Sequence, residues 1–335
     1  MLRFQQQVFF LITLFCVFSC EKKTEKKNVF IKKNREVVLE KTSSSEVLEN
    51  LVSNYLKELA KTQENRIFYK IEALENRKKA IDDFVFERYG AVSARATESL
   101  QILKSYNTFL KKQDFYLRGN KSASYKCIIK GDFKNNYKDT DPKELYVALN
   151  YLLEDREFIG KSDHFRLDIV DVLREILVLS SNSTYQKIKE DLHSKDSISF
   201  LQHSQEFLTI LQNLENVLAT RNEFSFGVYL SEVKALGKTA ADKKLIEQIF
   251  TQKIIASNYD MSGLIKTLYH PLWSNYFLAM QEDLNQKTIK ARIAQFLEKW
   301  IQEPKQLPSF SVGDEVELVL EILQNYSSSN KSSIL

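Results

Sequence analysis

Three carboxylates of this 335-residue chain are spaced so that a helix would bring them to one face. Asp168, Asp171 and Glu175 are separated by three and four residues, and Arg174 follows Asp171 by three. Paired carboxylates can exchange protons with a substrate, so this face is a candidate for acid–base chemistry. The same spacing is typical of a solvated helix face with an ion pair between Asp171 and Arg174. We favour the solvated face.

Residues for other kinds of chemistry are scattered. The four histidines, at positions 164, 193, 203 and 270, have no second histidine or cysteine at the spacing of a metal site. The chain contains no glycine-rich phosphate loop, no nucleophile elbow and no paired-histidine zinc motif. We therefore expect no metal site, no cofactor and no catalytic residue.

The elements that carry these residues are predicted to be helices. Eight glycines and four prolines make up only about 4% of the chain, against roughly 12% in ordinary proteins. This composition excludes an all-β sandwich, and the absence of strand–helix alternation argues against a parallel sheet. The net charge of +4 is spread along the chain, so we expect no nucleic-acid partner.

Apolar residues recur at helical spacing along most of the chain, which predicts an all-α, multi-helix bundle. One segment near 111–142 breaks the pattern and is predicted to be an irregular excursion. The apolar stripes lie at 48–59, 165–176, 207–218, 245–250, 289–301 and 316–323.

Three predicted helices begin with a capping residue. Ser43 and Glu46 have capping-box spacing, as do Thr239 and Asp242. Asp314 can cap the last helix.

The N-terminus has the features of a secretion signal. An apolar run from Val8 to Phe18 ends just before Cys20. The run is too short to span a bilayer but fits the core of a signal peptide. Residues 17–20 resemble a bacterial lipobox, so we expect removal of residues 1–19 and acylation of Cys20. Ordinary secretion with cleavage nearby is the alternative.

Acylation would determine where the protein resides. Acyl chains on Cys20 would hold it to a membrane of the bacterial cell envelope after export. Residues 20–42 are polar and lysine-rich, which is typical of a solvated spacer, with contact to anionic headgroups as the alternative. Cys127 is the only thiol beyond the anchor, so no internal disulfide is expected.

Five stretches of the chain share their order with a known family. The first is similar to Asp-Phe-x-x-Arg-Arg-Tyr-Gly and the second to Phe-x-Tyr-Asp-Leu-Val-Asp-x-x-Arg. The stretches are Asp83–Gly90, Phe165–Arg174, Val217–Thr220 with Phe224–Gly227, Ser262–Leu264 with Tyr269–Trp273, and Glu298–Trp300 with Gly313–Asp314. Together they resemble the C-terminal all-helical domain of the α-N-acetylglucosaminidase family of glycoside hydrolases.

The resemblance implies a domain over residues 80–326, preceded by an N-terminal helical segment (43–79) that packs onto it and followed by a polar tail (327–335). Enzymes of that family are retaining exo-hydrolases of terminal α-linked N-acetylglucosamine, and their two catalytic carboxylates lie on a (β/α)₈ barrel. Only about 60 residues separate Cys20 from Asp83, whereas a barrel needs about 250. The resemblance therefore carries over no catalytic residue, and we lean against an enzyme.

The pocket loops of the family domain are altered here. A Cys-Ala-Arg-Pro pattern corresponds to Cys127–Lys130, without its Arg and Pro. The loop that ends at Met261 contains no Trp, and Leu272 replaces the Arg of Tyr-x-Pro-Arg-Trp. Because loops carry binding while core positions carry packing, the domain is expected to have lost its tie to the barrel's substrate.

Three hypotheses about the role of the protein follow from this interpretation. The first is a lipid-anchored, non-catalytic module that binds a glycan or a protein partner in glycan degradation. Its candidate ligand-binding residues are Tyr116, Tyr125, Tyr137 and Tyr259. The second is the helical subunit of a split α-N-acetylglucosaminidase whose barrel is a separate chain. The third is a decayed remnant.

Overall fold

A computed structural model describes residues 44–75, 77–112, 142–257, 259–282, 286–308 and 313–330. Within these ranges the fold is all-α, as the composition predicts, and the only β-type pairing is one isolated bridge between Ser225 and Ser262. The resemblance to a helical domain is therefore matched by the secondary structure. Residues 113–141 lie outside the described residues, and with them nearly all of the predicted excursion.

Many of the helices are joined by short connections, while residues 113–142 separate the helix that ends at Lys112 from the one that begins at Lys143. Those before the centre of the fold are α2 (Ser45–Thr62), η1 (Gln63–Asn65), α3 (Ile67–Lys70), α4 (Lys78–Tyr89), α5 (Ala94–Lys112), α7 (Lys143–Glu154) and α8 (Arg156–Ile159). The others are α9 (Asp163–Ser194), α10 (Ser197–Leu218), η3 (Asn222–Phe224), α11 (Phe226–Ala235), α12 (Ala240–Ser257), η4 (Ile265–Tyr269), α13 (His270–Gln281), α14 (Gln286–Gln302) and α15 (Glu315–Asn330).

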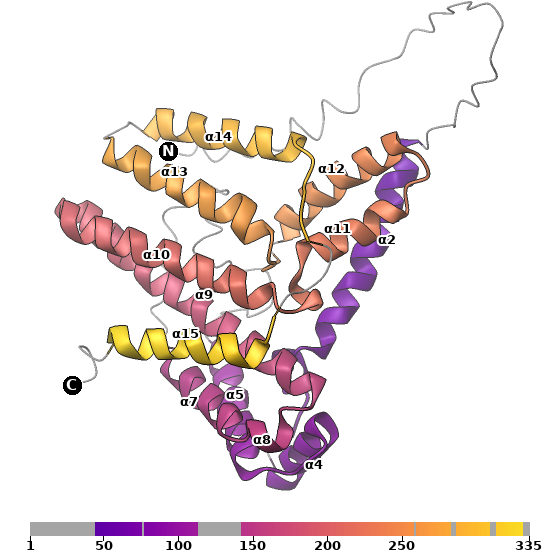
Figure 1. Ribbon diagram of the computed structural model, residues 1–335, viewed down its shortest axis with the longest axis vertical. Coiled ribbons are helices and arrows are strands. Elements are labelled where there is room, and N and C mark those ends of the chain that lie inside the picture. Colours follow the sequence, from indigo (N-terminus) through magenta and orange to yellow (C-terminus); the bar gives the residue numbers. More distant parts are fainter. Residues whose placement is uncertain are drawn as a thin grey trace, which may run out of the picture.

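Helix α9 forms the centre of the fold. It is 32 residues long, and every residue from Leu167 to Leu179 is buried. Helices α4, α7, α10 and α15 pack against it (Figure 1). A helix that is apolar on most of its circumference is expected to be covered on all sides, and residues 167–179 of α9 meet this condition except at four charged positions.

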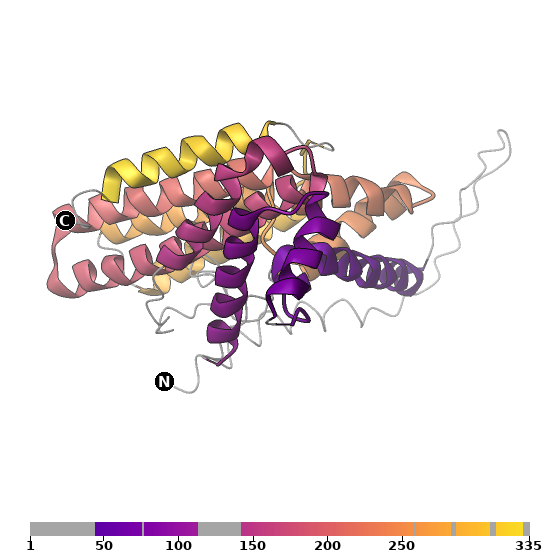
Figure 2. The ribbon, with the colours of Figure 1, turned by 90° about the horizontal axis from the view of Figure 1, so that it is seen from below.

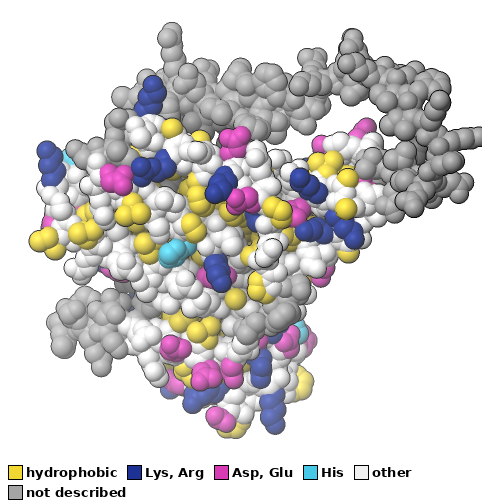
Figure 3. All heavy atoms as spheres, turned by 45° about the horizontal axis from the view of Figure 1, so that its top comes forward, with side chains coloured by type: hydrophobic (Ala, Val, Ile, Leu, Met, Phe, Trp, Pro, Cys, Tyr) yellow, Lys and Arg dark blue, Asp and Glu magenta, His cyan; other side chains and the backbone are white. Residues whose placement is uncertain are grey.

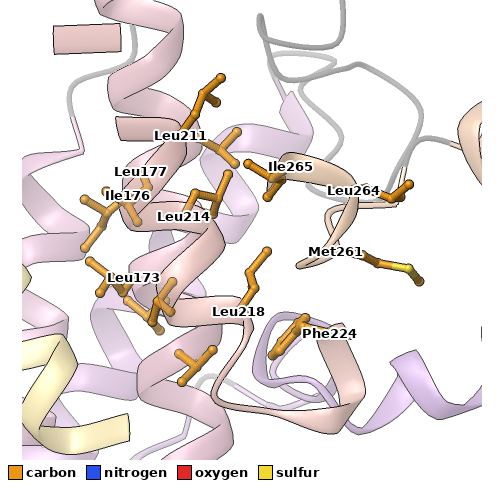
Figure 4. Close-up of a cluster of buried hydrophobic side chains, with 14 of the residues drawn as sticks. Leu173, Ile176, Leu177, Leu211, Leu214, Leu218, Phe224, Met261, Leu264 and Ile265 are labelled. Atoms are coloured by element: carbon orange, nitrogen blue, oxygen red, sulfur yellow. The ribbon is translucent and has the colours of Figure 1, made fainter. Parts of the chain in front are cut away.

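The core between α9 and α10 consists of aliphatic side chains. Figure 4 shows the cluster, which also contains residues of the segment that leads into η4. Burying each of these side chains stabilises the fold by roughly 1.5–3 kcal/mol. The labelled members are Leu173, Ile176, Leu177, Leu211, Leu214, Leu218, Phe224, Met261, Leu264 and Ile265, each at most 1% exposed.

An aromatic cluster joins α13 to the α9–α10 pair. The ring of Trp273 lies 4.7 Å from that of Phe207 and 5.5 Å from that of Tyr185, measured between centroids. Phe277 adds a further contact to Trp273 at 5.2 Å. Trp273 ends the Tyr269–Trp273 stretch, so this part of the resemblance is a packing feature.

The N-terminal helix α2 packs against α12, and both extend into the same lobe of the molecule (Figure 2). Tyr55 donates a hydrogen bond of 2.5 Å to Glu232 of α11, and its ring meets that of Phe250 at 5.9 Å. Leu48, Val52 and Leu59 are buried at this contact. The segment before the family-like domain is thus helical and docked on it.

Two of the three predicted caps are present. Thr239 and Asp242 form a reciprocal capping box, with bonds of 3.2 and 3.0 Å. Asp314 accepts from the first turn of α15 at 3.1 and 3.3 Å. The cap predicted at Ser43 is wrong. The N-cap position of α2 is the next residue, Ser44, and its side chain makes no hydrogen bond to the first turn of the helix.

The C-terminal helix differs from the sequence-based prediction. Helix α15 continues to Asn330, beyond the start of the segment predicted to be a tail. Among the described residues, no helix has both the length and the apolar character needed to cross a bilayer.

Gly227 allows a close approach of two chain segments. A Cβ atom at this position of α11 would lie 2.0 Å from the carbonyl oxygen of Pro308. We predict that Gly227→Ala lowers the free energy of unfolding by about 2–3 kcal/mol, because backbone must move to make room. Urea denaturation followed by circular dichroism measures the change.

Gly90→Ala is the control for this substitution. Gly90 has a φ of 79° but nothing within 4 Å of the added Cβ, so only the backbone conformation opposes the methyl group. We expect a loss of about 1 kcal/mol. Equal losses for the two variants would contradict the steric role of Gly227.

Candidate functional site

Most residues predicted from the sequence to bind a ligand or a lipid lie outside the described residues. These are Cys20, Tyr116, Tyr125 and Tyr137. Tyr259 is described and is half-buried, with its side chain against the core. Burial raises its pKa, and the neighbouring Tyr69 adds to the shift. Among the predicted ligand-binding residues, Tyr259 is the one that lies within the described part of the chain.

The carboxylate face of α9 is buried, so the predicted solvated face is wrong. Asp168 and Asp171 are 0% exposed, Arg174 is 3% exposed and Glu175 is 5% exposed. The predicted ion pair between Asp171 and Arg174 is present, with 3.0 Å between Asp171 Oδ1 and Arg174 Nε. The difference arises because other elements cover this face and supply cations to it.

Asp168 is paired with α4. Arg88 donates to both carboxylate oxygens of Asp168 at 2.5 Å, and Tyr89 donates to Oδ2 at 2.8 Å. Arg88 also donates to the carbonyl oxygen of Asn65 at 2.9 Å. This bidentate geometry joins the first family-like stretch to the second, and the pair satisfies most of the polar atoms that it buries.

Asp171 is the acceptor for two arginines. Its Oδ1 accepts from Arg66 Nε and from Arg174 Nε, each at 3.0 Å, and Arg66 Nη2 is also bonded to it. Burial raises the pKa of Asp171, but the two guanidinium groups outweigh this and the net pKa is lowered. Asp171 is thus ionised. Arg66 lies between η1 and α3, so the N-terminal segment contributes directly to this cluster.

Arg174 links Asp171 to two further carboxylates, one of which lies nearer to the surface. Its Nη1 donates to Asp260 at 2.8 Å and its Nη2 to Glu175 at 3.0 Å. The side chains of Asp260 and Arg66 are each 14% exposed, so they form the edge of the cluster that water can reach. We call these five residues, including Asp171, the Arg174 cluster.

Glu175 holds a proton more tightly than an ordinary glutamate. Burial is the main cause that raises its pKa to about 7; Arg174 opposes the shift, while Asp260 and Asp171 add to it. The cluster contains two arginines and three carboxylates, so one proton balances its charge. A pKa in this range is a feature of acid–base residues, and it also arises in structural ion networks.

The geometry favours the structural interpretation. The Glu175 side chain is only 6% exposed, and the guanidinium of Arg174 occupies its acceptor oxygen. A general base must reach the proton of its substrate within hydrogen-bonding distance, which this burial prevents. No group of residues suited to a metal ion occurs in the described part of the chain.

A second carboxylate holds the backbone that follows Asp260. Both oxygens of Glu215 accept from the backbone amide of Gly263, at 2.9 and 2.8 Å, and Oε2 also accepts from the backbone amide of Lys266 at 3.1 Å. Gly263 has a φ of 82°, which favours glycine. The π-helical turn η4 begins here, and Ser262 pairs with the backbone of Phe224 at 2.8 Å.

Sequence reasoning missed Arg66 and Glu215. Glu215 had a detectable signal, because it follows Leu214 on the buried face of α10, and a carboxylate in such a stripe needs donors. Arg66 had no local signal. It lies between two short helices, and its partner Asp171 is 105 residues away in the sequence.

Residues 81–325 match the family described as Alpha-N-acetylglucosaminidase (NAGLU) C-terminal domain. The chain belongs to this family. The resemblance inferred from the five stretches is confirmed. No curated protein matches the sequence.

Solved structures show the same fold. A family 89 glycoside hydrolase from Clostridium perfringens in complex with PUGNAc is 19% identical, with a TM-score of 0.61 over 76% of this chain and 32% of its own. A structure from the same organism in complex with its substrate GlcNAc-alpha-1,4-galactose gives 19% identity and a TM-score of 0.60, over 77% and 32%. The chain therefore spans about a third of the length of these enzymes.

In this NAGLU C-terminal domain, the family-like stretches bind one another. Arg88 and Tyr89 of the first stretch bind Asp168 of the second, and Ser262 of the fourth pairs with Phe224 of the third. These contacts show that the stretches contribute to the packing of the domain.

The raised pKa of Glu175 makes a prediction about stability. Between about pH 4.5 and 7 the unfolded chain loses this proton while the folded chain keeps it, so stability falls as pH rises through this window. Glu175→Gln cannot lose a proton. We expect the variant to match the wild type at pH 4 and to exceed its free energy of unfolding at pH 8 by up to about 3 kcal/mol.

Urea denaturation at several pH values measures this difference. Glu190→Gln is the matched control, since Glu190 is exposed on the same helix, and it should leave the pH profile unchanged. If wild type and Glu175→Gln gave parallel profiles, Glu175 would not hold the extra proton.

Proposed function

We propose that this protein is a non-catalytic helical module, anchored in the bacterial cell envelope by lipid on Cys20, which binds a glycan or protein partner in glycan degradation. One observation carries the proposal. The match to the family lies wholly in its helical domain, and the carboxylates buried at the centre of that domain are bound by arginines.

The arrangement of carboxylates supports a non-catalytic role. A retaining glycosidase needs two carboxyl groups about 5–5.5 Å apart on either side of the substrate bond. In the family these groups belong to the barrel. Here Asp168 and Asp171 are fully buried and paired with arginines, so they are closed to a sugar ring.

Tyr259 is the best-placed residue for a glycan ligand. It is half-buried beside Asp260, at the edge of the Arg174 cluster. Its ring offers a flat surface, and the adjacent carboxylate offers an acceptor for hydroxyl groups. Hydrogen bonds from Arg174 to Asp260 and from the amide of Gly263 to Glu215 hold the segment 259–263 in place. A fixed segment favours binding without a large loss of conformational entropy.

A split enzyme is the second candidate. Phe86, Val92 and Phe158 are 56%, 64% and 77% exposed. Phe86 lies on α4, which packs against α5. The amide of Ala96 in α5 donates a hydrogen bond of 3.2 Å to Asp155 at the start of α8, the helix of Phe158. Exposed apolar side chains in one region favour contact with another protein, and a separate barrel-bearing chain is one such partner.

Hydrolysis of an aryl α-N-acetylglucosaminide separates these functions. We expect the purified protein to release no aryl group by itself and to add nothing to the activity of lysate from its source. Release by the protein alone would overturn the non-catalytic role. A gain above the background of the lysate would favour the split enzyme.

Acylation is tested by metabolic labelling with a palmitate analogue in a bacterial host. We predict that the wild type takes up the label and sediments with membranes, because Cys20 follows a lipobox-like sequence. Cys20→Ser should lose both properties. Cys127→Ser is the matched control and should retain them, and label on Cys20→Ser would contradict the assignment.

A further inference from the structure

The chain enters the described fold at one end of the lobe formed by α2, α11 and α12. Tyr55 of α2 contacts Glu232 of α11 and Phe250 of α12, while Thr62, at the end of α2, binds Tyr229. Helix α2 therefore runs parallel to α12 and antiparallel to α11. Its first turn lies beside the α11–α12 turn, as Figures 1 and 2 both show. We call this end, residues 44–47 and 236–244, the tip.

The tip is basic and partly apolar. Val47 and Leu236 are 50% and 43% exposed. Figure 3 shows Lys and Arg side chains among hydrophobic ones on this lobe. Three lysines of the tip are exposed and have no carboxylate partner among the described residues: Lys238, Lys243 and Lys244.

The carboxylates around the tip leave this positive charge largely unbalanced. Asp242 is buried and bound in the capping box with Thr239. Glu247 is bound to Lys234 at 2.6 Å. Only Glu46, in the first turn of α2, is exposed at the tip itself.

We propose that the tip docks on an anionic bilayer surface, with the three lysines at the headgroups and Val47 and Leu236 at the interface. The proposal rests on the proposed anchor at Cys20. Lysine clusters beside exposed apolar side chains have this affinity, and each lysine near the surface strengthens binding several-fold.

The position of the tether selects a membrane as the occupant. Ser44 is 24 residues after Cys20, which gives a reach of at most about 85 Å, and the tether joins the fold at the tip. An acyl chain on Cys20 would hold the point at which the chain enters the fold within this reach of the bilayer, and would raise the effective concentration of the tip there. The exposed Ile198 and Leu201 lie on α10, whose first turn is at the far end of the molecule from the tip (Figure 1).

Chemical labelling of amines tests the proposal on the acylated protein reconstituted in vesicles. On phosphatidylcholine vesicles containing phosphatidylglycerol, we expect the tip lysines to react several-fold more slowly than on phosphatidylcholine alone. Lys195, at the α9–α10 turn, should react equally on both. High salt should remove the protection, because it screens the headgroups. Equal reactivity of the tip lysines on the two kinds of vesicle would overturn the proposal.

The mass of the Cys20 peptide reports acylation separately, so failure of the anchor is recognised. The non-acylated protein is then tested by flotation with phosphatidylglycerol vesicles. We expect Lys238→Glu/Lys243→Glu/Lys244→Glu to reduce flotation at least tenfold. The control reverses three exposed lysines elsewhere, Lys187, Lys195 and Lys287, and should float like the wild type. Equal flotation of the two triple variants would also overturn the proposal.

Discussion

Helix α9 brings four charged side chains into a region that water does not reach, and the pairing of these charges constrains every element around it. An unpaired charge in such a place costs several kcal/mol, so each carboxylate requires a cation at a defined position. Arg88 meets this need from α4, Arg174 from α9 itself and Arg66 from the N-terminal segment. Loss of Arg88 would remove the cation that is paired with Asp168, and loss of Arg66 would leave Asp171 with Arg174 alone, so α4 and the N-terminal segment both contribute to the pairing on this one helix.

The same pairing explains why sequence stretches typical of a glycosidase family occur in a chain for which we propose no catalysis. Asp168 and Asp171 look like acid–base residues on a helical face, yet their partners are arginines of the same domain. A fold can persist while the function of its relatives does not, since packing and reaction place different demands on the residues. The likeness to the clostridial enzymes therefore concerns the scaffold.

The segment that follows Asp260 and the tip differ in how their polar groups are bound. The backbone after Asp260 is held by Arg174 and by Glu215, which makes this edge of the domain a preformed surface. The tip, by contrast, carries lysines that have no carboxylate partner in the described part of the chain. The surface proposed to bind a ligand and the tip proposed to dock on a membrane therefore lie at different places on one helical domain.

The helical class, two of the three caps and the family could be predicted from the sequence. Composition, apolar periodicity and the Thr239–Asp242 spacing are local properties, and local hydrogen bonds realise the capping box. The burial of the carboxylate face of α9 could not be predicted, because it depends on the tertiary structure. Periodicity shows which residues share a face, but it does not show whether another element covers that face. Arg66 and Arg88 reach α9 across 105 and 80 residues of sequence, and pairing at such separations depends on the packing of the whole chain.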